Sequence, residues 1–582
     1  LLSATTADYN TAVGSGAMDT TSTGTQNVAV GYKAMDANTT GNYNVAVGYN
    51  ALDANSTANS NTAVGHSALT ANTTAANNVA LGKDSLYSNT TGSENTAVGT
   101  EAMYGNTTAA NNTAVGYYAL RTNSTGANNV AVGFGSLDAN TTANNNTAVG
   151  FSALTANTTG TLNTAVGAGA AQSNETGGAI TAVGKDAGYS VTADHNTLYG
   201  SGAGYTISTG TQNVIAGSNA GYYSNGSYNV AMGQNALVGP STGQSANHNT
   251  AVGYYALAAN TTGAQNTAIG SNALISLTTG TGHTALGYRA GADVTTAVQG
   301  TYIGYGAGEN VTTGNNNVFI GYGAGDACTT GTPNVAIGVA AYGSGGAGGG
   351  TENVAVGHQA LTSADDGGFY NTAIGNQAGY YITTGDYNVS IGRAADQVTT
   401  TGGPNISIGA SAKPSGAGGS HQIAIGYNVT CNGNSNFTFG NGTTDTSCDF
   451  GSTTWVLPSD ERIKEEIEDD VIGLSFINDL RPRTFRYRKE KDIPEALKSH
   501  VSGSEKRFRN DKYQHGFIAQ EVKEAIDKHN FKDGFDMWSE NETDGKQLVG
   551  PTAVIPMLIK AVQELSAENK ALSDRLTTLE NK

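Results

Sequence analysis

The chain has 582 residues, of which 80 are glycine and only 9 are proline, and charged residues make up 13%. So little proline excludes a collagen triple helix, and so few charges remove the repulsion that keeps many disordered chains open. Residues 1–458 hold 7 Lys/Arg against 21 Asp/Glu, whereas residues 459–582 hold 21 against 25. Two physically different parts therefore meet near residue 458. Because neither part is basic overall, nucleic acid is not expected as a partner.

The first three-quarters of the chain repeats one short motif, Asn-(Thr/Val)-Ala-(Val/Ile)-Gly. Its glycine recurs every 17 residues from Gly14 to Gly184 and then every 16 to 20 residues as far as Gly426, which gives 25 copies. A degenerate copy ends at Gly440. Each copy combines a short alternating strand, a small apolar pair and a turn-rich segment, which is too short for a propeller blade and has no helical period.

These repeats predict a mostly β fold, a parallel β-solenoid or β-roll in which each copy forms one coil. Within the strand, Ala points to one face, and Thr/Val and Val/Ile point to the other. Stacked coils are expected to hydrogen-bond to one another and to bury a continuous Val/Ile/Ala/Leu seam. At ~4.8 Å per coil, the resulting rod is roughly 115 Å long. We assign the repeats to residues 1–442 and a connector to residues 443–458.

The repeat over residues 8–440 resembles the head repeat of YadA-like trimeric adhesins, whose units read Asn/Ser-x-Ala-Ile-Gly. This resemblance implies a left-handed parallel β-roll that packs as a homotrimer. The head repeats of that family are often shorter, so the 17-residue period implies a longer turn in each coil.

Several side chains recur at fixed places in the repeat. The asparagine that opens each motif is interpreted as a ladder that satisfies backbone groups of the turns, with glycan contact as the alternative. Tyrosines that follow the motif glycine, such as Tyr32 and Tyr117, are interpreted as packing between protomers or over the edge of the roll, with sugar or protein contact as the alternative. The scattered histidines lack metal-ligand spacing and are expected at the surface or in turns; they are His66, His195, His248, His283 and His358.

The remaining features of the repeat region predict neither a metal nor a cofactor. Cys328, Cys431 and Cys448 are interpreted as free buried thiols, with a Cys431–Cys448 bridge as the alternative. No stretch reaches the ~18 apolar residues of a membrane span, so no membrane partner is predicted. Insertions at residues 237–249 and 343–350 break the period, and because insertions in a solenoid become loops, we expect receptor contact there.

The sequence from Ser459 to Ile467 is charged and predicts a helix for which Ser459 is the N-cap. Its pattern Ser459-Asp460-x-Arg462-x-Lys464 is similar to the opening signature of the endosialidase-type intramolecular chaperone, a self-cleaving peptidase domain at the C-termini of phage tailspikes and fibres. Three later segments are similar to that family in the same order, and the resemblance spans residues 459–582. These segments are 480–487, 515–522 and 555–565.

The resemblance implies that Ser459 is the nucleophile, Lys464 its partner and Pro458–Ser459 the bond that is cut. The domain would then be a single-turnover serine autoprotease without an external substrate. A hydroxyl is a weak nucleophile unless a base takes its proton, which a partly desolvated lysine can do. Positions five apart lie about 140° apart around a helix. Ser459 is therefore expected outside the helix, or Lys464 is expected to reach the serine of a neighbouring protomer.

The last segment predicts a coiled coil over residues 556–582, because apolar residues alternate four and three apart. Asn569 occupies an a position, where a polar residue can fix the register. The heptads indicate an oligomer, and only the two resemblances indicate three chains. The seam consists of Leu558, Val562, Leu565, Asn569, Leu572, Leu576 and Leu579.

Together these features predict the precursor of a phage tail fibre or tailspike, a trimeric adhesive rod for host attachment. It would be assembled in the host cytoplasm and reside in the virion tail, with other tail proteins and a bacterial surface receptor, glycan or protein, as partners. One alternative is a bacterial cell-surface trimeric adhesin, which should end in an outer-membrane anchor. A second alternative is a polysaccharide-depolymerising tailspike, which requires an acidic pair that the carboxylate-sparse repeats do not show.

Overall fold

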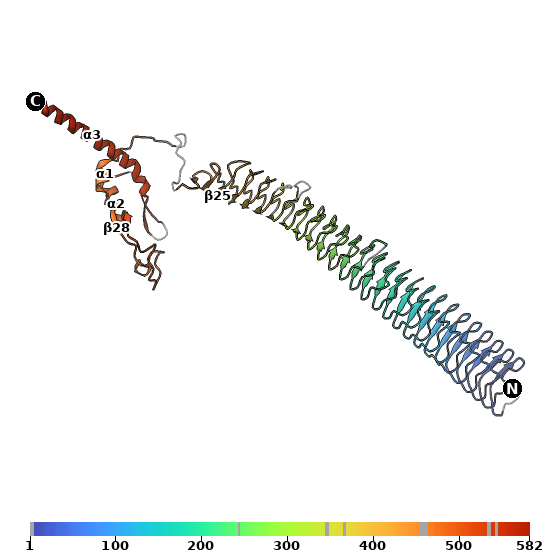
Figure 1. Ribbon diagram of the computed structural model, residues 1–582. Coiled ribbons are helices and arrows are strands. Elements are labelled where there is room, and N and C mark those ends of the chain that lie inside the picture. The colour runs from blue at the N-terminus through green and yellow to red at the C-terminus, as the bar shows by residue number, and fades with distance from the viewer. Residues whose placement is uncertain are drawn as a thin grey trace. The chain divides into compact units, whose positions relative to one another are not determined.

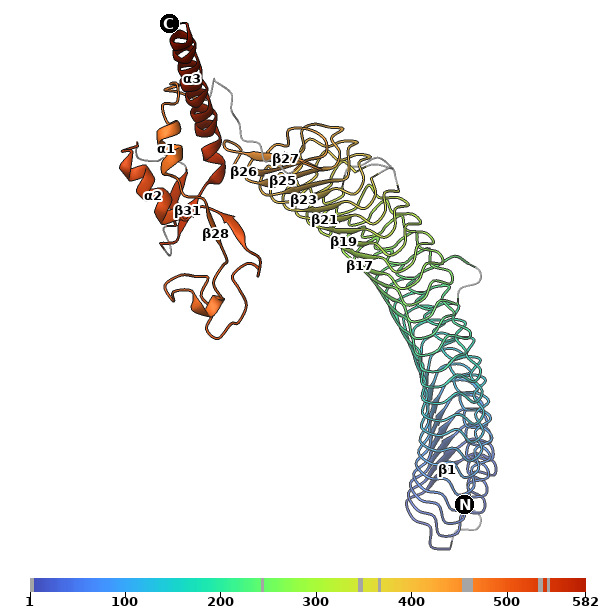
Figure 2. The ribbon, with the colours of Figure 1, turned by 60° about the vertical axis from the view of Figure 1, so that its left-hand side comes forward.

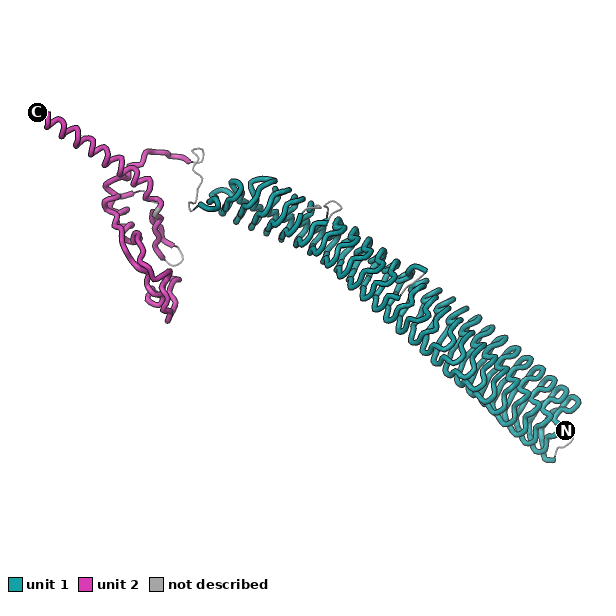
Figure 3. Tube along the Cα trace, in the orientation of Figure 1, with its two compact units in different colours: residues 1–458 teal, residues 459–582 magenta. Residues whose placement is uncertain are grey.

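The computed structural model describes residues 5–241, 245–343, 349–364, 368–452, 464–531, 537–541 and 545–581. The chain divides into two compact units, residues 1–458 and residues 459–582 (Figure 3). The first unit is a β-solenoid, and the second is a small unit of helices and two-stranded sheets.

In the first unit, the described residues form one sheet of 27 strands (Figure 1). Each strand from β1 to β25 pairs in parallel with the next along the chain, motif against motif, so that Ala29 lies opposite Ala46 and Ala46 opposite Ala63. Strand β27 then pairs antiparallel with β26 and ends the sheet. The predicted mostly β fold, a parallel solenoid of 17-residue repeats, is confirmed.

The strands of the solenoid are β1 (Thr11–Val13), β2 (Val28–Val30), β3 (Val45–Val47), β4 (Thr62–Val64), β5 (Val79–Leu81), β6 (Thr96–Val98), β7 (Thr113–Val115), β8 (Val130–Val132), β9 (Thr147–Val149), β10 (Thr164–Val166), β11 (Thr181–Val183), β12 (Thr197–Tyr199), β13 (Val214–Ala216), β14 (Val230–Met232), β15 (Thr250–Val252), β16 (Thr267–Ile269), β17 (Thr284–Leu286), β18 (Thr301–Ile303), β19 (Val318–Ile320), β20 (Val335–Ile337), β21 (Val354–Val356), β22 (Thr372–Ile374), β23 (Val389–Ile391), β24 (Asn405–Ile408), β25 (Gln422–Gly426), β26 (Asn436–Gly440) and β27 (Thr446–Asp449).

The three-residue strands from β2 to β23 bury their central residue and leave both flanking residues at least partly exposed. The central residue is alanine in most coils, and Ala46 has no accessible surface. The residue before the motif glycine lies on the outer face, where Leu81 is 46% and Leu286 47% exposed. The predicted seam is therefore correct for Ala and Leu but wrong for the Val and Ile of the strands. The reason is the alternation of a strand, which points only its middle residue into the narrow interior.

The interior of most coils is filled in one of two ways. In many coils a small strand centre is combined with a large residue four positions after the motif glycine, such as Ala46 with Leu52. In others the centre is large and that later position is glycine, as for Tyr302 and Gly308. A Cβ at Gly308 would lie only 2.4 Å from Tyr302 Cδ1. The two positions thus compensate for each other, as a close-packed interior requires.

Two buried asparagine ladders run along the solenoid and confirm the interpretation of the motif asparagine. The backbone N–H of Asn44 donates to Oδ1 of Asn27 at 2.9 Å, and the Asn44 side-chain amide donates to the Ala58 carbonyl at 2.8 Å. In the second ladder, Nδ2 of Asn55 donates to Oδ1 of Asn38 at 3.0 Å. Each buried turn therefore obtains hydrogen bonds that water cannot supply.

His283 occupies a position of the first asparagine ladder. Its Nε2 lies 2.7 Å from the Ala297 carbonyl, and its Nδ1 accepts from the Gly300 N–H at 3.0 Å. A neutral imidazole thus offers the same donor and acceptor as an asparagine amide, and burial lowers the pKa of His283. The expected surface or turn position is wrong for His283, whereas the other four scattered histidines are exposed.

The recurring tyrosines stack on their equivalents in neighbouring coils. The ring centroids of Tyr32 and Tyr49 are 5.2 Å apart, and those of Tyr305 and Tyr322 are 5.3 Å apart.

The three cysteines are free and buried, as predicted, and the alternative Cys431–Cys448 bridge is not formed.

In the second unit, the short helix α1 packs against the first part of the long helix α3, and α2 packs against α1, β30 and β31. Its apolar core contains Phe476, Val522, Ile526 and Met557. The far half of α3 extends away from the rest of this unit (Figure 2). Within the described residues, no helix is long and apolar enough to cross a membrane. The elements are α1 (Leu474–Asp479), β28 (Arg483–Phe485), η2 (Glu490–Asp492), β29 (Gln514–Gly516), α2 (Ala519–Lys528), β30 (Trp538–Glu540), β31 (Gln547–Val549), η3 (Pro551–Ala553) and α3 (Val554–Glu580).

Candidate functional site

The predicted cleavage site is only partly within the described residues. Pro458 and Ser459 lie outside them, and Lys464 is the first described residue that follows, with an exposed side chain. The helix predicted over residues 459–467 is absent from its described part, 464–467, because the first helix of the unit begins at Leu474. Five of the residues 465–470 are acidic, and their repulsion opposes a helix. The pairing of Ser459 with Lys464 stays a prediction.

The segment that follows Lys464 is fastened to the long helix α3. Oε2 of Glu564 accepts the backbone N–H of Leu474 at 2.7 Å, at the first turn of α1. A Cβ at Gly473 would lie 2.3 Å from the same Glu564 oxygen, so a larger residue there would displace this carboxylate. The chain that leads away from the predicted cut is therefore linked to the helix predicted to associate.

Two of the sequence segments that resemble the chaperone family meet in space. Strand β28 comes from the first segment and pairs antiparallel with β29 from the second, with Thr484 opposite His515. Arg483 then donates to both carboxylate oxygens of Glu521 at the start of α2, at 2.9 and 2.5 Å. These hydrogen bonds hold the pKa of Glu521 below its usual value. The sequence shows that the two segments follow one another, but it gives no indication that they pair.

A second ion-paired contact joins α1 to the end of α2. Asp479 accepts from Lys528 at 2.7 Å and lies 2.5 Å from Nε2 of His529. The hydrogen bond from Lys528 and then the contact with His529 hold the pKa of Asp479 below its usual value. The His529 ring also packs edge to face against Phe476, which belongs to the apolar core. The ion-paired histidine is therefore in direct contact with the core.

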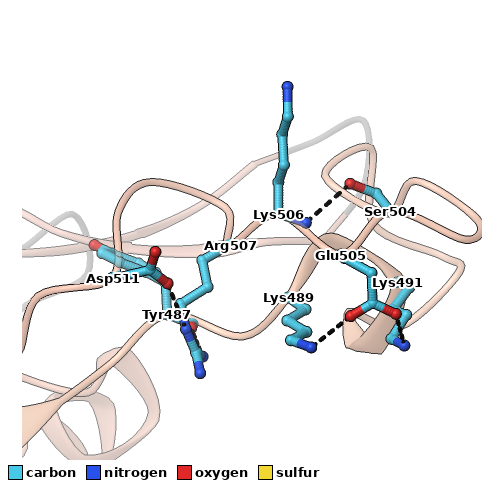
Figure 4. A network of polar contacts seen from close by, with 8 residues as sticks. All are labelled: Tyr487, Lys489, Lys491, Ser504, Glu505, Lys506, Arg507 and Asp511. Atoms are coloured by element: carbon cyan, nitrogen blue, oxygen red, sulfur yellow. Dashed lines mark hydrogen bonds and ion pairs between the residues drawn. The ribbon is translucent and has the colours of Figure 1, made fainter.

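An exposed arm between β28 and β29 is held by charged side chains. Glu505 accepts hydrogen bonds from Lys489 and Lys491, which lower the pKa of Glu505 to about 2 (Figure 4). Nη1 of Arg507 donates to the Tyr487 carbonyl at 2.7 Å across the same arm. The arm therefore keeps its form through charge pairs at the surface, where such pairs weaken in salt.

Helix α3 carries an apolar stripe that no other part of the described chain covers. Only Met557 and Ala561 of this helix are buried. Leu558 is 42% and Leu565 47% exposed, and exposure rises to 69% at Leu579. An uncovered apolar stripe with heptad spacing fits association with further helices.

Comparison with known proteins identifies the second unit in part. Residues 459–530 match a protein family described as "Chaperone of endosialidase", a self-cleaving chaperone domain of a peptidase family. The match begins at Ser459, where the second compact unit begins, and runs through α2. No curated protein and no solved structure matches the chain. A β-solenoid is therefore followed by a segment that matches an endosialidase-type chaperone domain.

Proposed function

We propose that this chain is the precursor of a trimeric phage tail fibre or tailspike. The observation that supports this most strongly is the chaperone domain placed directly after the β-solenoid. A rod of near-identical coils can pair out of register with its neighbours, because every coil offers the same edge to the next. A terminal unit that first aligns three chains removes that hazard and is dispensable afterwards.

The apolar surfaces of a single chain support a homotrimer. The residue before the motif glycine forms an outward apolar stripe along the whole solenoid and includes Leu81, Leu286 and Ile374, each at least 40% exposed. Monomers rarely expose apolar patches larger than about 300–600 Å², and the stripe follows all the parallel coils. Together with the stripe on α3, it gives two surfaces that further copies of the chain can cover.

The chemistry of the cut follows from the residue types. The Ser459 hydroxyl attacks the carbonyl carbon of Pro458 while Lys464 takes the hydroxyl proton. The C–N bond breaks, an ester links Pro458 to the serine oxygen, and the amino group of Ser459 receives the proton. Water then hydrolyses the ester, which leaves a carboxylate at Pro458 and restores the hydroxyl. No metal or cofactor takes part in this scheme.

The cut makes assembly one-directional. Once the aligning unit is gone, an unfolded rod cannot refold by the same route, so the mature rod persists through its slow unfolding. In this proposal the rod resides in the virion tail, joins other tail proteins and binds a bacterial surface receptor. The insertions at 237–249 and 343–350, of which 242–244 and 344–348 lie outside the described residues, are our candidates for receptor contact.

The test compares the full chain with Ser459→Ala and with Ser502→Ala, an exposed serine of the same unit, as the matched control. The wild type and the control should release a rod that stays trimeric on a denaturing gel after heating. The Ser459→Ala chain should stay uncut and unfold faster. Equal unfolding rates would contradict the trapping, and an uncut wild type would contradict the roles of Ser459 and Lys464.

A further inference from the structure

The aromatic residues that follow the motif glycine form stacked runs, and one run ends in an open ring face. Tyr117, Phe134 and Phe151 occupy this place in three successive coils, with neighbouring ring centroids 5.4 and 5.3 Å apart. In that order the residues are 43%, 48% and 60% exposed. Exposure rises towards Phe151 because the next coil carries only Ala168 at this place. One face of the Phe151 ring is therefore not covered by another ring.

Hydrogen bonds between the coils fix the height of each residue in this row. The Gly169 N–H donates to the Phe151 carbonyl at 2.9 Å, and the Asp186 N–H donates to the Ala168 carbonyl at 2.8 Å. Neighbouring coils lie ~4.8 Å apart, and carbon atoms in contact lie ~3.5–4 Å apart. A ring stacked on Phe151 would therefore lie at the height of Ala168, where the protein has no ring of its own.

Two polar side chains lie beside Ala168. A Cβ added to Gly169, the next residue, would lie 2.4 Å from Oδ1 of Asp186 and 3.4 Å from Oε1 of Gln172, so both groups reach over this glycine. Within the described chain neither side chain makes a hydrogen bond, and Asp186 has one ion pair, with Lys185 at 3.6 Å. A carboxylate and an amide with unused hydrogen-bonding capacity thus lie next to an aromatic face.

We infer that Phe151, Asp186 and Gln172 bind one neutral hexopyranose ring of a glycan. The apolar C–H face of such a ring packs on the face of Phe151. Its hydroxyl groups donate to the Asp186 carboxylate and exchange hydrogen bonds with the Gln172 amide. An acidic sugar is disfavoured, because the Asp186 carboxylate and the net negative charge of the solenoid repel it.

A second copy of the chain is the competing occupant of this row. It would bury the Lys185–Asp186 pair, whose side chains are 73% and 32% exposed in the single chain. Burying an ion pair is unfavourable unless further hydrogen bonds satisfy both groups. A sugar leaves the pair at the surface and supplies hydroxyl groups to the carboxylate, so the glycan is the better occupant.

A second run of aromatic rings shows what sets this place apart. The run that contains Tyr305 also ends in a ring that is 60% exposed, that of Tyr322. The next coil carries Val339 where the first run is followed by alanine, and Gln359 stands where the first run has Asp186. Because the larger side chain takes part of the space and the carboxylate is missing, we expect no comparable binding at Tyr322.

In the proposed fibre, this site would add a glycan contact to those expected of the insertions. A trimer would present three equal sites, which raises the avidity for a glycan with repeated units. This consequence rests on the proposed function, whereas binding of the sugar by the folded chain does not.

The experiment measures saturation-transfer NMR from the wild-type protein to the methyl glycosides of glucose, galactose, mannose and N-acetylglucosamine, each added alone. We expect transfer to the ring C–H protons of at least one of them and none to methyl glucuronide. Absence of transfer to all the neutral glycosides would overturn the proposal. Cutting at Pro458–Ser459 is followed on the same samples, so lost sugar binding with normal cutting would reject this site and leave the proposed function standing.

Three variants locate the binding. Ala168→Phe adds the next ring of the run and should abolish the transfer, because its ring takes the place of the sugar. Asp186→Gly introduces the residue that the adjoining coils have at Gly169 and Gly202 and should weaken binding at least tenfold. Tyr322→Ala, the matched control, should leave binding unchanged. Transfer that persists in folded Ala168→Phe, or that is lost in Tyr322→Ala, would contradict the site.

Discussion

At the scale of single residues, glycine is required where the strand centre is large. Gly308 has a φ of +60°, and a Cβ there would lie 2.4 Å from Tyr302 and 3.1 Å from Phe319. Gly308→Ala should therefore destabilise the coils of β18 and β19 by about 2–4 kcal/mol. Amide hydrogen exchange of these coils measures the loss. Gly416→Ala, where no atom lies within 4 Å, is the control, and equal protection in both variants would contradict this packing.

The acidic residue Asp326 makes its coil sensitive to pH. Burial, together with the nearby Glu309, raises the pKa of Asp326 to about 6. Because the folded-state pKa lies above the unfolded value, protonation favours the folded state. Local stability should rise by about 1 kcal/mol, after allowance for solvent screening, as pH falls from 7 to 4. Asp326→Asn should remove this dependence in hydrogen exchange, and a gain that persists in the variant would exclude Asp326 as its source.

At the scale of elements, the apolar stripe of α3 is exposed, and we expect it to associate with other copies of the chain. Leu565 and Leu572 are 47% and 59% exposed on its apolar stripe. The double variant Leu565→Glu, Leu572→Glu should convert the oligomer to monomer, because each change places a charge in the helix seam. Sedimentation of the uncut Ser459→Ala chain measures this, with Lys570→Glu, off the stripe, as control. A trimer that survives the double variant would show that α3 does not hold the chains together.

The repeat could be read from sequence far better than the second unit. A fixed period, an alternating strand and a buried asparagine at each turn are local properties, so the solenoid and its ladder were predicted correctly. Hydrophobicity alone predicts the strand Val and Ile inside the coil. Their outward position follows instead from the narrow width of the coil, which accepts only the central residue of each strand. His283 and Asp396 would stand out in an alignment of the repeats, at positions that are mostly Asn and mostly Leu, Met or Gly.

In the second unit, long-range contacts decide the structure. Residues 464–467, the described part of the helix predicted from Ser459, are not helical, and the acids of residues 465–470 oppose a helix there. The pairing of Arg483 with Glu521 spans 38 residues, and that of Leu474 with Glu564 spans 90. Neither pairing has a local sequence signal. The roles of Ser459 and Lys464 rest on resemblance and on the family match, not on geometry.

At the scale of the whole molecule, we expect the rod to assemble only when the chaperone unit belongs to the same chain. A chain of residues 1–458 alone should therefore fail to form a heat-resistant trimer and should aggregate through its exposed strand edges and apolar stripe. Residues 459–582 added as a separate chain should not restore assembly. Recovery of soluble, trimeric rod from residues 1–458 would show that the solenoid aligns itself.

The most direct test of the central claim is the mass of the chain after expression. We expect two pieces, of 458 and 124 residues, that meet at Pro458–Ser459, whereas Ser459→Ala should give a single chain of 59.0 kDa. Lys464→Ala should also stay intact, and Lys491→Ala, in the charged arm of the same unit, should be cut normally. An intact wild-type chain, or a cut at another bond, would contradict the account.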